Sequence, residues 1–240
     1  MRFSYFLSDF WYFLGAPQAE RPAVPLSFGQ QVQVLAYALL TNYALMLLAV
    51  LPLGLLFGPE LEERHRVKEL MDESSPLVFL LTAAVMAPLL EETIFRLFLR
   101  YHLVNVLLSA SLGAIFLLLA LPATWLWLGL GGIGLCLLWL LFNLYRHSLP
   151  ELYFQEWWHR RLPWLYFGSS LVFALVHLNN YNLPLGKSLF YAPVLVLPQF
   201  FIGLVLGYVR IRFSFGMAVL VHALHNGSLV LPILLFKELV

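Results

Sequence analysis

Residues 76–103, PLVFLLTAAVMAPLLEETIFRLFLRYHL, form a long apolar stretch with Glu91, Glu92 and Arg96 in its middle. A stretch of about 20 apolar residues is long enough to cross the hydrocarbon core of a bilayer as a helix. A charge at the centre of such a helix costs about 2.5–3.5 kcal/mol even on the most lenient insertion scale. These charged residues therefore need partners, and either a function or a buried packing network accounts for them.

The composition of the whole chain also indicates a membrane protein. Of the 240 residues, 61% are hydrophobic and only 11% are charged, whereas a soluble domain is about half apolar and a quarter charged. The net charge of +1 argues against a nucleic-acid partner, because such proteins usually carry a basic face. The apolar stretches predict an all-α, polytopic membrane helix bundle of about seven (six to eight) transmembrane helices. They lie at 31–58, 76–103, 105–121, 123–145, 164–180, 190–209 and 214–236.

The chain is predicted to divide into a short N-terminal part and one large domain. Residues 1–30 comprise an aromatic-rich segment, expected to lie at the bilayer interface as an amphipathic helix, followed by a proline-punctuated linker. Residues 31–240 are expected to form a single transmembrane catalytic domain, with a motif-bearing core at about 76–236. The lipid bilayer is thus the first predicted partner.

Small residues and arginines near the C-terminal end of the chain give two further expectations. Gly203 and Gly207 form a GxxxG pattern, and GLGGIG at 129–134 is similarly rich in small residues. Both patterns predict close packing between helices. Arg210 and Arg212 are predicted to lie in a short loop, exposed to water or to lipid headgroups.

Helical spacing separates the two adjacent glutamates. Glu92 and Arg96 are four residues apart, so they lie on one face of the helix and can form an ion pair. Glu91 points about 100° away around the helix axis. Glu91 is therefore the carboxylate that stays available for another role.

Two other predicted spans carry polar residues at a similar depth. His177 follows Phe173 by four residues, and His222 and Asn226 are four residues apart. A lone histidine in a membrane often serves only as an interhelical hydrogen-bond partner. Counting about 1.5 Å per residue, however, Glu91, His177 and His222 all fall about 12–18 Å from the N-terminal side of the bilayer. Their common depth predicts one hydrated cavity.

These side chains suit hydrolysis by water. A carboxylate and an imidazole that share a water can remove its proton, and a second imidazole and an amide can donate hydrogen bonds to the oxyanion that forms. Glu91, His177 and His222 could instead hold zinc and leave the fourth position for water. No HExxH motif is present, and we prefer the version with no metal and no other cofactor.

The three polar motifs resemble those of a known family. EETIFR at 91–96, FALVH at 173–177 and HALHN at 222–226 are similar to the EExxxR, FxxxH and HxxxN motifs of the CaaX-protease and bacteriocin-processing (CPBP, or Abi) intramembrane endopeptidases. The family includes the eukaryotic enzyme that trims prenylated Ras-type proteins. The motifs occur in the family's order, from the second predicted span to the seventh.

The resemblance implies a role for each motif residue. Glu91 with His177 would activate the water, and His222 with Asn226 would stabilise the oxyanion, by a glutamate-dependent mechanism without metal. The residues that would orient this site are Glu92, Arg96 and Phe173.

The predicted function is therefore an intramembrane endopeptidase in the cell (inner or plasma) membrane. Its substrate would be a membrane-anchored protein or peptide, with a prenylated tail as the archetype. A transporter or proton-coupled carrier could also use intramembrane Glu, His and Arg, but inverted repeats or matched broken helices would then be expected. A non-enzymatic scaffold or immunity protein that kept the fold is the third interpretation, and decay of the motifs would indicate it.

Overall fold

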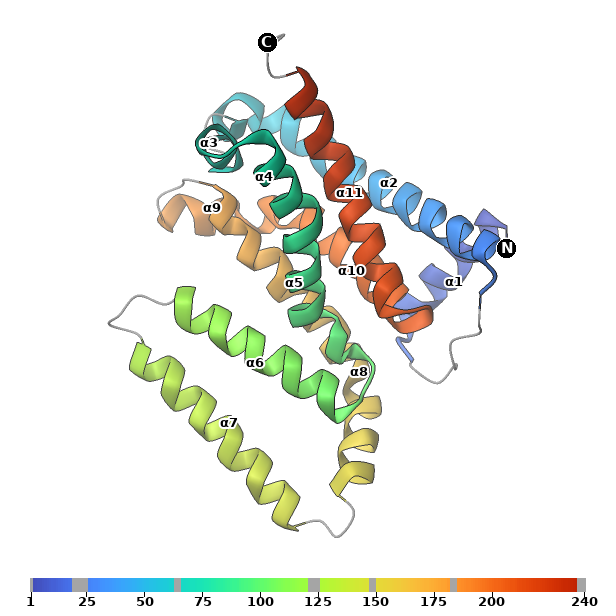
Figure 1. Ribbon diagram of the computed structural model, residues 1–240, viewed down its shortest axis with the longest axis vertical. Coiled ribbons are helices and arrows are strands. Elements are labelled where there is room, and N and C mark those ends of the chain that lie inside the picture. The colour runs from blue at the N-terminus through green and yellow to red at the C-terminus, as the bar shows by residue number, and fades with distance from the viewer. Residues whose placement is uncertain are drawn as a thin grey trace.

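The structure is a computed structural model that describes residues 2–18, 26–62, 66–120, 126–146, 150–181 and 185–236. The described chain is built almost wholly from helices (Figure 1). In chain order the α-helices are α1 (Phe3–Gly15), α2 (Phe28–Glu62), α3 (Arg66–Glu73), α4 (Pro76–Leu81), α5 (Ala87–Phe95), α6 (Leu103–Ala120), α7 (Leu126–Arg146), α8 (Pro150–Val176), α9 (Leu185–Leu195), α10 (Leu197–Arg212) and α11 (Phe215–Phe236). A π-helical turn, η1 (Thr82–Met86), joins α4 to α5, and short 3₁₀ turns follow α5 and α8 as η2 (Leu97–Leu99) and η4 (His177–Asn180).

The predicted class, an all-α polytopic membrane bundle, is confirmed. Within the described residues, five segments are long and apolar enough to cross a membrane. A further apolar helix, Leu103–Leu119, is shorter. The predicted number of seven spans is therefore not confirmed. The five segments are Phe28–Leu51, Pro76–Leu99, Leu126–Asn143, Pro150–Asn180 and Phe215–Leu235.

The predicted span at 190–209 is wrong as a single helix. The structure divides it into α9 and α10, which meet at Val196. Pro198 lies in the first turn of α10, where its missing N–H and fixed φ are tolerated, whereas inside a continuous helix it would break the hydrogen-bond ladder. Helix α10 packs against α2, α8 and α11 at the centre of the bundle (Figure 1). Every residue from Ile202 to Ile211 is buried.

The two glycines of α10 allow neighbouring side chains to approach its backbone. A Cβ atom at Gly203 would lie 3.2 Å from the Cβ of Ser170, and one at Gly207 would lie 2.8 Å from the ring of Tyr166. The close packing predicted from the GxxxG pattern is confirmed. On α7 the corresponding prediction is wrong, because no neighbouring atom lies within 4 Å of a Cβ placed at Gly131 or Gly134.

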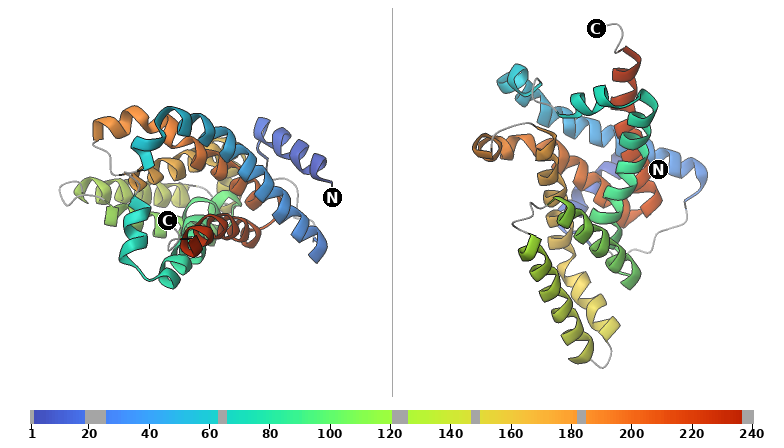
Figure 2. Two further views of the ribbon diagram at one scale, coloured as in Figure 1. Left: turned by 90° about the horizontal axis from the view of Figure 1, so that it is seen from above. Right: turned by 60° about the vertical axis from the view of Figure 1, so that its left-hand side comes forward.

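Helix α1 packs against the protein through one aromatic face. Phe6, Phe10 and Phe13 are fully buried, and α1 lies beside α2 and α10 (Figure 2). Its acidic residue, Asp9, accepts a hydrogen bond from the hydroxyl of Tyr208 at 2.9 Å. Asp9 also pairs with Arg212, whose Nε lies 3.2 Å from the carboxylate. The amphipathic helix predicted for the N-terminal segment is therefore present, with its apolar face on the bundle.

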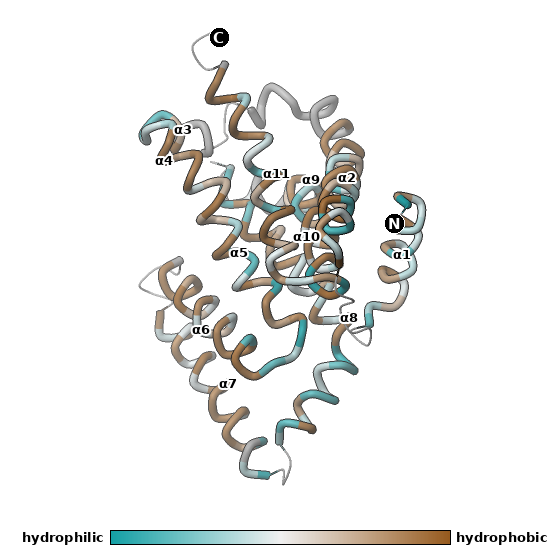
Figure 3. The backbone as a smooth tube through the Cα atoms, turned by 45° about the vertical axis from the view of Figure 1, so that its right-hand side comes forward, coloured by the Kyte–Doolittle hydropathy of each residue, from teal (hydrophilic) through white to brown (hydrophobic). Residues whose placement is uncertain are grey.

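Helices α6 and α7 extend from one side of the bundle, next to the first half of α8 (Figures 1 and 2). Their tubes are apolar along most of their length, whereas the first half of α8 is largely hydrophilic (Figure 3). The segment 151–163, predicted to be interfacial, is continuous with the spanning part of α8. This arrangement leaves room between α5, α6 and α8, where the cavities described below lie.

Gly207→Ala tests the tight contact at the centre of the bundle. The added methyl group must displace the ring of Tyr166, whose hydroxyl donates to the carbonyl of Leu204 at 2.6 Å. We expect the free energy of unfolding in detergent to fall by about 1–3 kcal/mol, as for overpacked cores. Gly134→Ala on α7 is the matched control, because it meets open space. Equal effects of the two variants would contradict this account of the core.

Candidate active site

Helix α5 positions the two glutamates so that they face different environments. The side chain of Glu92 is fully buried, whereas that of Glu91 is 27% exposed. The helix is short because Arg96, its next residue, leaves the helical conformation with φ −129° and ψ −24°. The α-helix therefore ends at Phe95, earlier than the predicted span, which ran to residue 103. Glu91 and Glu92 nevertheless point in the different directions that helical spacing predicted.

Glu92 is the centre of a buried network of charged and polar side chains. Its Oε1 lies 3.2 Å from Nη1 of Arg96, which is the predicted ion pair between residues four apart. The same oxygen accepts a hydrogen bond from Nδ1 of His222 at 2.9 Å. The guanidinium of Arg96 also lies over the ring of Phe173, with Cζ 3.7 Å from its centroid, a favourable cation–π contact. Phe173, which was singled out from its motif, thus stabilises the guanidinium of Arg96.

His222 lies between the two glutamates. Its Nδ1 faces Glu92, and its Nε2 lies 3.6 Å from Oε2 of Glu91. A carboxylate accepts hydrogen bonds and does not donate them, so the Nδ1 atom carries the proton that binds Glu92. This contact fixes the orientation of the ring. The Nε2 atom is therefore the one available to Glu91 or to a bound molecule.

His177 is held by a bond to its own helix. Its Nδ1 donates to the carbonyl of Phe173 at 2.7 Å, and the two rings are in contact with centroids 4.5 Å apart. With the proton on Nδ1, the Nε2 atom is an acceptor. An acceptor nitrogen of this kind is what a general base, or a group that orients water, requires.

Glu91 and His177 line the same cavity, which we call the inner cavity. Its volume is about 300 Å³, and it lies between α5, α6 and the end of α8. Apart from these two residues the lining is apolar, from Ala87, Leu90, Ile94, Phe95, Leu112, Ile115, Phe116, Leu119 and Val176. The structure thus brings two of the predicted site residues to one apolar space.

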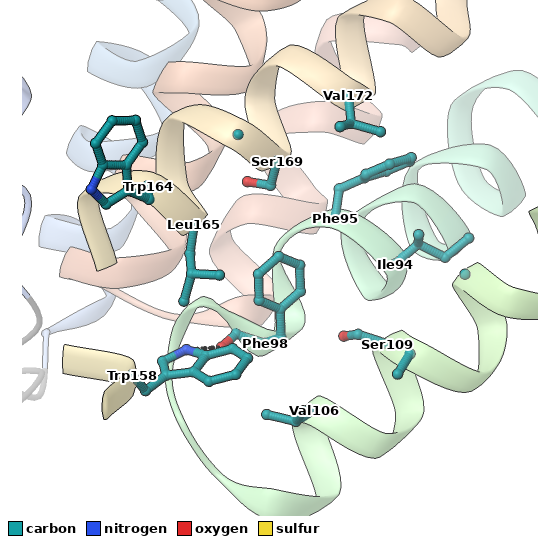
Figure 4. A pocket seen from close by; sticks show the side chains of 13 residues that line it. Ile94, Phe95, Phe98, Val106, Ser109, Trp158, Trp164, Leu165, Ser169 and Val172 are labelled. Atoms are coloured by element: carbon teal, nitrogen blue, oxygen red, sulfur yellow. Dashed lines mark hydrogen bonds between the residues drawn. The ribbon is translucent and has the colours of Figure 1, made fainter. Parts of the chain in front are cut away.

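A second cavity, the outer cavity, continues from the first. It has a volume of about 430 Å³ and shares Ile94 and Phe95 with the inner cavity. Figure 4 shows its aromatic end, where the indole of Trp158 donates to the carbonyl of Phe98 at 3.0 Å. Its two serines donate to backbone carbonyls, Ser109 at 2.7 Å and Ser169 at 3.1 Å. The polar groups of the wall are therefore occupied, and a ligand would meet an apolar surface.

Asn226 is joined to the π-helical turn. Its Nδ2 donates to the carbonyl of Ala83 at 2.9 Å, which holds α11 against η1. An amide nitrogen carries two hydrogens, so one N–H is left for another acceptor. Asn226 lies one helical turn after His222, as its spacing predicted.

His225 lies three residues after His222 on α11 and packs against a different helix. The structure buries His225 and sets its ring against Tyr43 of α2, with centroids 5.3 Å apart. The hydroxyl of Tyr43 bonds Ser228, and Ser228 donates to the carbonyl of His225 at 2.7 Å. These contacts hold α11 against α2, on a different side from the inner cavity.

The predicted loop position of Arg210 and Arg212 is wrong. Both lie in the last turn of α10, and Arg210 is only 6% exposed. Its Nη2 donates to the carbonyl of Leu97 at 2.8 Å. The signal was present in the sequence, because no proline or glycine follows Gly207 before residue 213 to end the helix.

The described residues contain no group of three His, Cys, Asp or Glu side chains arranged to hold a metal ion. The zinc set considered from the sequence, Glu91, His177 and His222, is not such a group. The Nδ1 atoms of both histidines are already bonded within the protein. These bonds leave the Nε2 atom of each ring as the one that could reach a metal, so zinc remains the alternative that the chelation assay below tests, and no step of the mechanism proposed below uses a metal.

The fold and the site define a class of protein: a polytopic helical membrane protein with a buried carboxylate–imidazole cluster beside an apolar cavity. A family model described as Type II CAAX prenyl endopeptidase Rce1-like matches residues 143–228. The match includes His177, His222 and Asn226, and thus two of the three motifs, and over this segment it confirms the family resemblance predicted from them. No curated protein and no solved structure matches the chain.

At the level of the family, the match supports a protease of the membrane, a CAAX-type endopeptidase. Such an enzyme acts on a membrane-associated protein. Glu91, Glu92 and Arg96 lie outside the matched segment, so their roles depend on the geometry.

Glu92→Ala tests the buried ion pair. Without the carboxylate, Arg96 is left as a buried charge, and we expect the free energy of unfolding to fall by about 3–5 kcal/mol. Glu156→Ala is the matched control, since Glu156 pairs with Arg160 at the same helical spacing and both side chains are exposed. Its loss should cost about 0.5 kcal/mol or less. Similar losses, measured by unfolding in detergent, would contradict the central position of Glu92.

Proposed function

We propose that this protein is an intramembrane endopeptidase that hydrolyses a peptide bond of a membrane-associated protein or peptide, in the cell (inner or plasma) membrane. The observation that carries the proposal is the pair formed by Glu91 and His177 at the inner cavity. Glu91 is the carboxylate outside the ion pair, and His177 presents an acceptor nitrogen. Both are next to an apolar space that a substrate can enter.

In this mechanism Glu91 acts as the general base. A water between Glu91 and His177 gives its proton to Glu91 while its oxygen forms a bond to the carbonyl carbon of the substrate. The proton then passes to the amide nitrogen, the C–N bond breaks, and an acid and an amine leave the site. General-base catalysis of this kind contributes about 10²- to 10⁴-fold in rate.

The oxyanion that forms in the first step is assigned to His222 and Asn226. His222 donates from Nε2, the nitrogen that faces Glu91, when the ring is the imidazolium and carries a proton on both nitrogens. Asn226 donates the N–H that Ala83 does not use. The removal of one oxyanion donor typically lowers kcat by about 10²- to 10³-fold. Glu92 supports the arrangement because it holds the opposite nitrogen of His222, while Arg96 and Phe173 hold Glu92 in place.

The inner and outer cavities support an apolar substrate. The two share Ile94 and Phe95 and extend from Glu91 to the indole of Trp158. A large aliphatic side chain, or a prenyl group attached to the substrate, matches such a lining by its hydrophobicity. The family description, a prenyl endopeptidase, favours the prenylated tail as the first substrate to test. No metal or other cofactor is part of the proposal.

Glu91→Gln tests the general base. It keeps the shape of the side chain and removes the proton acceptor, so we expect kcat to fall by about 10²- to 10⁴-fold with the unfolding midpoint unchanged. The assay is cleavage of a quenched fluorescent farnesylated peptide by the purified protein, beside its unprenylated form. Glu156→Gln is the control, and a chelator should leave the rate unchanged.

Three outcomes of that assay would count against the proposal. Full activity of Glu91→Gln would show that the base is another residue. Loss of activity on chelation, restored by zinc, would replace the metal-free mechanism. Failure of the wild type to cleave either peptide would count against an endopeptidase of this specificity.

Leu112→Trp tests the inner cavity as the substrate pocket. Leu112 lines this cavity, and the larger side chain would exclude an apolar group whose burial contributes about 1.5–3 kcal/mol. We expect KM for the farnesylated peptide to rise by about tenfold or more, with kcat little changed. Leu108→Trp is the control, because Leu108 is an exposed residue of α6 that lines neither cavity. An unchanged KM in Leu112→Trp would place the substrate elsewhere.

A further inference from the structure

The end of the helix that carries Glu91 and Glu92 is held by side chains from three other helices. The last carbonyl groups of a helix have no partner within it, and in a membrane each of them must find one inside the protein. Here the carbonyl of Thr93 accepts from Ser109 of α6 at 2.7 Å, and that of Phe98 accepts from Trp158 of α8 at 3.0 Å. Two of the carbonyls between them, those of Arg96 and Leu97, are held by α10.

Arg210 is the residue of α10 that holds them. Its Nη2 donates to the carbonyl of Leu97 at 2.8 Å, and its Nε donates to that of Arg96 at 3.3 Å. Arg210 is buried, and among the described residues no carboxylate lies within 4 Å of its guanidinium. The planar fork of a guanidinium suits two adjacent acceptors better than a single ammonium does. Its hydrogen bonds are thus directed to the backbone after α5.

Arg100 makes the reciprocal contact. Its Nε and Nη2 donate to the carbonyl of Ile211, at 3.0 Å and 2.7 Å. The segment after α5 therefore holds the end of α10 while α10 holds that segment. We call Arg100 and Arg210, with the carbonyls they bind, the arginine clasp.

The clasp is directly connected to the proposed site. One of its carbonyls belongs to Arg96, whose side chain pairs with Glu92, and Glu92 binds His222. Helix α10 meets Arg96 a second time at Gly203, where a Cβ atom would lie 3.1 Å from Nη2 of Arg96. A shift of α5 along or around its axis would separate Glu92 from His222.

We propose that Arg100 and Arg210 are positioning residues of the reaction, which fix the depth and rotation of α5 so that Glu91 and Glu92 face His222. This inference rests on the proposed function for its catalytic readout. Neither arginine touches the inner cavity, so they act through the backbone of Arg96 and Leu97.

Arg210→Met and Arg210→Lys, compared with Arg212→Met, test the clasp in the full chain. We expect Arg210→Met to lower kcat by about 10- to 100-fold, the effect of a displacement of about 1 Å in a catalytic group, with KM little changed. Arg210→Lys keeps the charge but replaces the two-nitrogen fork by a single ammonium nitrogen, so it should recover part of the rate. Arg212→Met removes the pair with Asp9 on the α1 side, so it should lower the unfolding midpoint and leave kcat unchanged.

The second readout does not depend on peptidase activity. In ¹⁵N-histidine-labelled protein, the Nδ1 proton of His222 bound to Glu92 gives a low-field signal that is identified by its absence in His222→Gln. We expect this signal in the wild type and in Arg212→Met, and its shift or loss in Arg210→Met. If Arg210→Met does not fold, Arg210→Lys gives the same comparison, with a smaller change in both readouts.

The two readouts separate the two proposals. A wild-type His222 signal or an unchanged kcat in both Arg210 variants would overturn the clasp as a positioning device. A fall in the unfolding midpoint alone, as in Arg212→Met, would do the same. If the wild type cleaves no peptide, the proposed function fails, and the His222 signal alone decides whether the clasp orients α5.

Discussion

The buried contact between Arg96 and Glu92 is the constraint on which the rest of the structure depends. A charged guanidinium at membrane depth is tolerated only when it is paired and its surroundings are polar or aromatic. Here one carboxylate oxygen lies 3.2 Å from Nη1 and the ring of Phe173 lies against the guanidinium. Because that oxygen also binds His222, the requirement to neutralise Arg96 joins α5, α8 and α11.

Helix α10 accommodates this network because it has no acidic side chains and has glycines where neighbouring side chains approach it. It lies at the centre of the bundle with no acidic residue in its sequence, and its glycines leave space for Arg96, Ser170 and Tyr166. At its end the polarity changes, and Arg210 and Arg212 extend to opposite partners. Arg210 binds the segment after α5, the helix with the glutamates, and Arg212 binds Asp9 of α1. Helix α10 therefore connects the candidate site to the N-terminal helix.

The sequence predicted the features that depend on spacing within one helix. The four-residue separation of Glu92 and Arg96 indicated their ion pair, and the adjacent position of Glu91 indicated its different direction. The common depth of the polar residues indicated that Glu91 and His222 would meet, as they do at 3.6 Å. These inferences hold because helix geometry in a membrane is regular and the few polar residues have few possible partners.

The features that depend on contacts between helices were beyond sequence reasoning. Spacing alone paired Glu92 with Arg96 and did not indicate that His222 would bind the same oxygen. Hydropathy merged α9 with α10, since the segment stays apolar across the break that precedes Pro198. The buried bonds of Arg210 were missed because an arginine near the end of a span is commonly solvated. Arg210 is buried because the carbonyl of Leu97 lies where its guanidinium can bind it, and the sequence does not show that position.

The π-helical turn η1 has a consequence for how the length of this segment can vary. A π turn accommodates one residue more than a regular helical turn does. Loss of a single residue between Thr82 and Met86 would therefore leave a regular helix in which Glu91 and Glu92 keep about the same direction relative to α4. Loss of a residue from the regular part of the helix before Glu91 would instead rotate both glutamates by about 100°. A one-residue deletion is therefore tolerated better in η1 than in α5, where a change of length before Glu91 alters its angle even if hydropathy and span length allow it.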